Sequence, residues 1–258
     1  MKKIIGTTID GQRLVVLAPD ITIYSFIKKD EFTFLDLFYF FGQKLITNHP
    51  RGGNEDMKYI MQDLNKRVEQ MKYQVSEIQK LERKVLDQNI RCNINPYRFE
   101  HRWMASVESY LNTVHSIYDL LKVIDDRVDG TLCTTYIENE DWFRIEMDIR
   151  NLCHHNETPL LTTEGETIYL FFERLDSLRT VRYFQQERIN GQNKITVEVT
   201  SHDMGDELLK ALNLYTKEYL EQIDQNETIN TITGFHQDGR FKQKEIKLKD
   251  LMNTAKMN

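Results

Sequence analysis

One long helical pattern constrains this chain more than any other feature of its sequence. From residue 54 to about residue 88, apolar residues recur at steps of three or four, with charged and amide side chains between them. This spacing is typical of an amphipathic α-helix about 50 Å long. Because such a helix must bury its apolar stripe, the pattern predicts a helix bundle, and a free coiled coil is the alternative. The stripe consists of Leu64, Val68, Met71, Val75, Ile78, Leu81 and Val85.

Three further segments have the same periodicity. They predict helices over 96–128, 138–156 and 204–224. Among 258 residues there are only 11 glycines and 4 prolines, a composition that suits long helices. The links between the first three helices are short, which favours antiparallel neighbours and hence a four-helix bundle.

Two hairpins are predicted beside the helices. One covers residues 4–17 and turns at Asp10-Gly11, and the other turns at Asn190-Gly191 within a β-rich insertion at about 160–200. The predicted fold class is therefore mainly α with a β minority (α+β). It is an antiparallel four-helix bundle with the insertion between its third and fourth helices. We divide the chain into an N-terminal β-hairpin and aromatic segment (1–53), the bundle with its insertion (54–225) and a basic C-terminal extension (226–258).

The N-terminal segment holds a dense aromatic run. Residues 32–41 are mostly Phe, Leu and Tyr, and Asp30 is the expected N-cap of a helix running towards Ile46. We expect this run to be buried beneath the N-terminal hairpin; an exposed partner surface is the alternative. It is too short to cross a bilayer, so we expect no membrane span.

Charge and motif content exclude several classes of protein. There are 40 acidic and 34 basic residues, a formal charge of −6, which argues against binding to nucleic acid through a global basic field. The cysteines Cys92, Cys133 and Cys153 form no CxxC pair, which fits reduced thiols in a cytoplasmic protein. Phosphate-binding loops, GxSxG and HExxH are absent, so we expect neither cofactor nor metal. Asp125–Gly130 lacks the ligands of a calcium loop and is interpreted as a solvated helix end.

One stretch of the third helix carries groups suited to phosphodiester chemistry. Arg150 and Asn151 are followed by His154 and His155. A guanidinium can stabilise a phosphorane-like transition state, and an imidazole can transfer a proton to or from a ribose hydroxyl. Arg150 and His154 share a face if the helix continues, whereas His155 reaches Arg150 only if the helix ends or tightens there. A structural role for these cations at a helix C-terminus is the alternative.

The order of these residues near the end of the third helix resembles the RxxxxH motif of the HEPN superfamily, with Arg150, Asn151 and His155 as the matched residues. The resemblance covers about seven residues in motif and roughly 55–225 in architecture. It implies a metal-independent endoribonuclease of the toxin or antiviral-defence type, which cleaves RNA by attack of the 2′-hydroxyl. It also implies a homodimer and, as a further partner, a nucleotidyltransferase-like antitoxin. We expect Arg150, Arg144 and the lysine-rich tail to supply a local basic cleft.

Other polar and aromatic residues have simpler interpretations. His115 is expected to be a boundary residue that is hydrogen-bonded in the bundle rather than a catalytic partner. Trp103 and Trp142 are expected in the core. The competing functional hypothesis is a non-catalytic interaction protein that assembles through the long helix at 55–88. In that case, Arg150 should be tied to a carboxylate such as Glu146 or Asp148.

Overall fold

The structure is a computed structural model. The structure describes residues 2–7, 13–18, 32–48, 56–90, 97–155, 159–164, 167–172, 187–189, 192–199, 201, 203–235 and 241–255. The chain is mainly helical with a minority of antiparallel strands, as predicted. It divides into a unit spanning Thr33–Ile223 and a second unit made of Met1–Phe32 and Asp224–Lys256.

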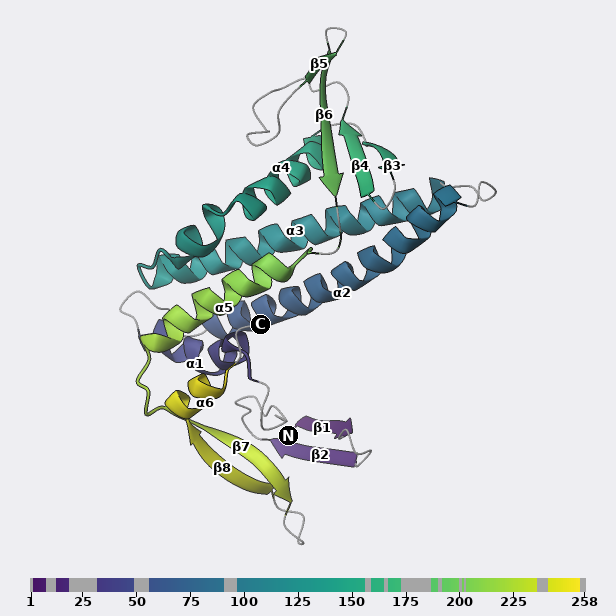
Figure 1. Ribbon diagram of the computed structural model, residues 1–258. Helices are drawn as coiled ribbons and strands as arrows, with labels where there is room; N and C mark the ends of the chain where they lie inside the picture. Colours follow the sequence, from purple (N-terminus) through teal and green to yellow (C-terminus); the bar gives the residue numbers. More distant parts are fainter. Residues whose placement is uncertain are drawn as a thin grey trace. The chain divides into compact units, whose positions relative to one another are not determined.

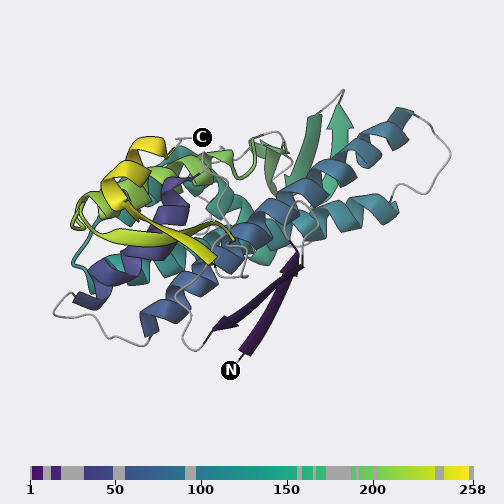
Figure 2. The ribbon, with the colours of Figure 1, turned by 90° about the horizontal axis from the view of Figure 1, so that it is seen from below.

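The first unit holds the long helices. They are α1 (Phe34–Asn48), α2 (Asp56–Ile90), α3 (Tyr97–Arg127), α4 (Asp141–His155) and α5 (Asp206–Glu221). Helices α2 and α3 lie side by side along most of their length (Figures 1 and 2). The third predicted helix begins later than residue 138, because a π-helical turn, η1 (Thr134–Glu138), precedes α4.

The apolar stripe of α2 lies in the core. Its members Leu64, Val68 and Ile78 are fully buried and belong to one hydrophobic cluster with residues of the other helices. A polar contact also joins α2 to α3, where the Gln74 amide donates a 2.6 Å hydrogen bond to the Ser109 hydroxyl. The helix is therefore packed within the unit rather than projecting alone.

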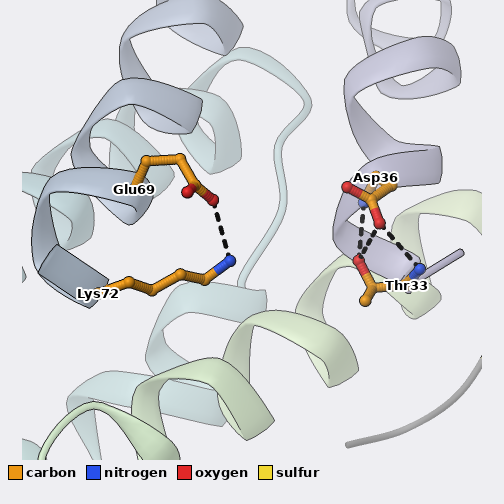
Figure 3. Close-up of polar contacts among 4 residues, drawn as sticks. All are labelled: Thr33, Asp36, Glu69 and Lys72. Carbon is orange, nitrogen blue, oxygen red and sulfur yellow. Dashed lines mark hydrogen bonds and ion pairs between the residues drawn. The ribbon is translucent and has the colours of Figure 1, made fainter. Parts of the chain in front are cut away.

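Helix α1 begins at a reciprocal cap. The Thr33 hydroxyl accepts from the Asp36 backbone N–H at 3.1 Å, and the Asp36 carboxylate accepts from the Thr33 backbone N–H at 3.0 Å (Figure 3). This is a capping box. The prediction that Asp30 is the N-cap was wrong, because Thr33 has a carboxylate three residues later that satisfies its own N–H.

The aromatic run of α1 is buried, but its neighbours are helices of the same unit. The Phe38 ring packs on Tyr215 and Tyr219 of α5, with ring centroids 6.1 and 5.7 Å apart. Helix α1 also contacts α2. The predicted boundary after residue 53 therefore differs from the observed division, which groups α1 with the other long helices.

A buried carboxylate closes the C-terminal end of α3. The side chain of Asp125 is only 4% exposed. It accepts from the Cys133 backbone N–H at 2.6 Å, from the Tyr215 hydroxyl at 3.3 Å and from the Tyr219 hydroxyl. The prediction of a solvated helix end was wrong for this residue, because donors from the following turn and from α5 replace its water.

The predicted insertion is a sheet between α4 and α5. Its strands are β3 (Leu160–Glu164), β4 (Thr167–Phe172), β5 (Glu187–Ile189) and β6 (Gln192–Val199), antiparallel in the order β3-β4-β6-β5. Ile189 pairs with Gln192, so residues 190 and 191 connect β5 and β6, as predicted, although these two residues lie outside the described part. Ile168, Leu170 and Phe172 alternate with less buried residues and join the helical core.

The second unit contains two antiparallel hairpins and a short helix. Strands β1 (Lys2–Thr7) and β2 (Arg13–Ala18) pair with each other, as do β7 (Thr228–Phe235) and β8 (Phe241–Lys247). Helix α6 (Leu248–Thr254) follows β8 directly. The predicted turn at Asp10-Gly11 lies outside the described residues. Within the described part, no helix has the length and apolar character needed to span a membrane.

Candidate functional site

Helix α4 carries the predicted site residues and packs against α3. Its apolar residues Phe143, Ile149 and Leu152 are buried. The contacts run in opposite directions along the two helices: Phe143 meets Tyr118, whereas Arg150 meets Asn112. The two helices are therefore antiparallel, and Arg150 lies half-buried at the edge of their contact.

Two amide oxygens hold the guanidinium of Arg150. Its Nε donates a 2.9 Å hydrogen bond to Oδ1 of Asn112 on α3, and its Nη1 donates a 3.4 Å bond to Oδ1 of Asn151 on α4. Both acceptors are neutral, so they orient the guanidinium without compensating its positive charge. An arginine held in this way can still bind an anion.

The two histidines differ in what the structure shows of them. Helix α4 continues through His155. Arg150 and His154 consequently share a face, one turn apart, and the His154 side chain is exposed. For His155 the structure describes only the backbone. His154 is therefore the imidazole that the helix brings onto the side of Arg150.

A buried carboxyl group lies one turn before Arg150. Oε1 of Glu146 accepts a 2.6 Å hydrogen bond from the Tyr110 hydroxyl, while Oε2 is buried without a partner in the described part. Burial raises the pKa of Glu146 to about 7, although the Tyr110 hydrogen bond acts in the opposite direction. Glu146 therefore bonds to α3 and not to Arg150, unlike the pairing expected of a purely structural arginine.

Arg144 does not join this site, contrary to the expectation of a shared basic cleft. Its guanidinium donates to the Glu138 carbonyl at 3.1 Å and to the Asn139 side chain at 2.8 Å. These acceptors precede α4, so they fix Arg144 at the beginning of the helix rather than near its end. The lysine-rich tail belongs to the second unit.

The Cys153 thiol, close to Arg150 in sequence, is not an activated nucleophile. Burial raises the pKa of the Cys153 thiol to about 12, with a further contribution from the charge of Glu108. The thiol is thus protonated at neutral pH and a poor nucleophile. Among the described residues, no three His, Cys, Asp or Glu side chains gather to hold a metal ion.

The sequence did not point to Asn112. His115 is half-buried, as expected of a boundary residue, and its Nδ1 lies 3.0 Å from Oδ2 of Asp119 on the same helix. The spacing of 112, 115 and 119 on one helix face was visible in the sequence. What the sequence lacked was the register of α4 on α3, which brings Arg150 to that face. Trp103 is fully buried as expected, whereas Trp142 is only half-buried.

Comparison with known proteins found no matching family model, no matching curated protein and no matching solved structure. The resemblance to the HEPN superfamily rests on the residues of the motif and on the order of the helices.

Proposed function

We propose that the protein is a HEPN-like, metal-independent endoribonuclease whose site is centred on Arg150. In this proposal, α2, α3, α4 and α5 form the four-helix bundle of the superfamily, and the sheet between α4 and α5 is an insertion. The observation that carries the proposal is the guanidinium of Arg150, held by two neutral amides at a half-exposed position. A structural arginine is more commonly neutralised by a carboxylate.

The proposed chemistry is cleavage of RNA by its own 2′-hydroxyl. The 2′-hydroxyl gives up its proton, and the 2′-oxygen attacks the adjacent phosphorus. The imidazole of His154 or His155 takes part in the proton transfers to and from the reacting oxygens. The bond from phosphorus to the 5′-oxygen breaks, and this oxygen takes up a proton. Arg150 stabilises the charge that develops on the phosphate oxygens, and Asn151 keeps the guanidinium in place. The products are a 2′,3′-cyclic phosphate and a 5′-hydroxyl.

The first test compares single-stranded RNA with DNA of the same sequence, incubated with the purified protein in EDTA. RNA should be cut and DNA spared, because DNA lacks the attacking hydroxyl. Arg150→Ala should reduce the cleavage rate by about 100-fold or more, the usual loss for an oxyanion-stabilising group. Arg144→Ala is the matched control on the same helix and should leave the rate unchanged.

Separate alanine substitutions of His154 and His155 identify the imidazole that acts. In cells, expression of the wild type should degrade total RNA and slow growth, whereas Arg150→Ala should do neither. Cleavage that EDTA abolishes and magnesium restores would contradict the mechanism, and so would full activity of Arg150→Ala.

We also propose a homodimer and a nucleotidyltransferase-like antitoxin as partners, both from the HEPN resemblance.

The alternative function is a non-catalytic interaction protein. It is favoured by two large exposed side chains on α2, Tyr59 at 69% and Tyr73 at 66% exposure. Fourteen residues correspond to nearly four turns, so both lie on one side of the helix. Under this alternative, replacing both tyrosines with serine should abolish assembly in sedimentation experiments, and Arg150→Ala should have no effect on it.

A further inference from the structure

The outward side of α3 carries an oriented imidazole. Nδ1 of His115 lies 3.0 Å from Oδ2 of Asp119, and the His115 side chain is 35% exposed. A carboxylate can only accept, so a hydrogen bond between these two groups would place the imidazole proton on Nδ1. In that neutral tautomer, Nε2 is the unprotonated nitrogen, available as a base.

His115 lies close to the residue that orients Arg150. Asn112 and His115 are three residues apart on α3, so they share a face with Cβ atoms about 5–6 Å apart. The Nε of Arg150 reaches Oδ1 of Asn112 from α4. On α3, His115 lies between Asn112 and Tyr118, which both contact α4. The imidazole is therefore one helical turn from the point where the guanidinium crosses onto α3.

We infer that His115, oriented by Asp119, is a further proton acceptor in the site of Arg150, so that one chain supplies both a guanidinium and an oriented imidazole to the same phosphodiester. The inference rests on the proposed ribonuclease function. Nε2 of His115 takes the proton of the 2′-hydroxyl as the 2′-oxygen bonds to phosphorus. His154 or His155, in its protonated form, donates a proton to the departing 5′-oxygen. Asp119 is a positioning residue, since it acts only through His115.

The charges around this site are mixed. Asp119 and Glu108 are among the carboxylates on this side of α3, and Glu108 lies one turn before Asn112, near Cys153. Lys122 is one turn beyond Tyr118, with its ammonium 5.3 Å from the Tyr118 ring centroid. Arg150 is therefore the cation that would attract a phosphate, with Glu108 on one side of Asn112 and Asp119, beyond His115, on the other.

The inference is tested by histidine NMR of the full chain, with uridine 3′-monophosphate and inorganic phosphate as probes. Variant His115→Ala assigns the resonance. Both probes should shift the His115 signal, because a phosphate held by Arg150 would lie next to this imidazole. Variant Arg150→Ala should weaken the effect at least tenfold. His101 is the matched control: it is exposed on α3, about 21 Å along the axis from His115, and its signal should not move.

Kinetics supply the second measurement. Variant Asp119→Asn presents an amide that can donate to Nδ1, which moves the imidazole proton to Nε2. It should lower kcat on a single-stranded RNA about 100-fold with little change in KM, and it should shift the acidic limb of the pH profile. The melting temperature of Asp119→Asn should stay within about 2 °C of the wild type, because the pair is exposed.

The outcomes separate this inference from the proposed function. If Arg150→Ala abolishes cleavage while His115→Ala and Asp119→Asn retain the wild-type rate, the ribonuclease stands and the role of His115 is overturned. If RNA is not cut but phosphate moves the His115 signal in an Arg150-dependent manner, the ribonuclease proposal fails and the shared phosphate site stands. A His115 signal unmoved by either probe overturns the inference.

Discussion

At the scale of single residues, the site is defined by what lies next to Arg150. A neutral acceptor, Asn112, orients this cation, and a carboxyl group on its own helix, Glu146, is bonded elsewhere. Asn112 can be replaced with aspartate and Glu146 with glutamine, and each replacement has nearly the same shape as the original side chain. The charge of the site can thus be changed without changing its packing.

Asn112→Asp should impair phosphate binding while leaving the fold intact. The new carboxylate would accept from the same guanidinium Nε and would neutralise its charge. An exposed ion pair adds only about 0.2–1 kcal/mol to stability, so the melting temperature should be unchanged or slightly raised. Affinity for uridine 3′-monophosphate, measured by titration calorimetry, should fall about tenfold, equivalent to about 1.4 kcal/mol. Unchanged affinity would mean that Arg150 does not bind the phosphate.

Glu146→Gln should flatten the dependence of stability on pH. Because the folded-state pKa of Glu146 is raised to about 7, its stabilising contribution is complete below the unfolded value of 4.5 and is lost as pH rises towards 7. The shift corresponds to at most about 3 kcal/mol. Glutamine keeps an acceptor for Tyr110 but cannot ionise.

Urea unfolding at pH 5 and pH 8 measures this effect. The wild type should lose more unfolding free energy than Glu146→Gln between the two values. Glu140→Gln, at an exposed position just before α4, is the control and should behave like the wild type. Equal losses in the wild type and Glu146→Gln would show that the carboxyl group titrates normally.

At the scale of helices and strands, the ends of the helices are fixed by a few polar groups. The capping box starts α1, and the Asp125 cluster closes α3. Gly130 packs so closely on this cluster that a Cβ there would lie 2.6 Å from the Tyr219 hydroxyl. These contacts set the boundaries within which the apolar stripes pack.

Asp125→Asn should destabilise the protein markedly. An amide can accept from the two tyrosine hydroxyls with its oxygen, but its NH₂ then faces the Cys133 backbone N–H, a donor against a donor. Loss of a buried, charge-assisted hydrogen bond costs about 2–3 kcal/mol, which chemical denaturation would measure. Asp126→Asn, at the exposed neighbouring position, should change stability by less than about 0.5 kcal/mol. Equal effects of the two substitutions would refute the role of the cluster.

Thr33→Ala should weaken the start of α1. It removes the hydroxyl that caps Asp36 N–H and leaves the carboxylate with a single partner in the box. The expected cost is about 1 kcal/mol in unfolding free energy. Lys72→Ala is the comparison, because Figure 3 shows Lys72 in an ion pair with Glu69, and this pair is exposed. That pair should contribute only a few tenths of a kcal/mol to the free energy of unfolding. A larger loss of unfolding free energy than this in Lys72→Ala would contradict this account.

The helices and strands followed from the sequence where periodicity alone determines them. The stripe of α2 and the alternation in β4 have regular spacings. Five of the seven stripe residues are buried and the other two, Val75 and Leu81, are half-buried, while every second residue of β4 is buried. Residues whose partner is distant in sequence could not be predicted. Asp125 is interpreted as solvated until Tyr219 is known to lie beside it, and Asn112 has no evident role until Arg150 reaches it.

At the scale of the whole molecule, we expect a homodimer. One chain supplies one Arg150, and the HEPN resemblance implies two motifs lining one cleft. Light scattering should report about 62 kDa, twice the 30.8 kDa of one chain. A species of about 31 kDa at all practical concentrations would count against the dimer and would leave His115 as the source of the second imidazole.

The packing of α1 on α5 determines how this unit can fold. Phe38 and Tyr219 are separated by nearly the whole length of the unit, yet their rings are in contact. Neighbouring helices such as α2 and α3 can associate early, because their contacts close short loops. The contact between α1 and α5 must wait until α5 has been synthesised, and until then the buried aromatic face of α1 has no partner on α5. A nascent chain stalled before residue 206 would therefore expose that face, which makes it a natural binding site for a chaperone during translation.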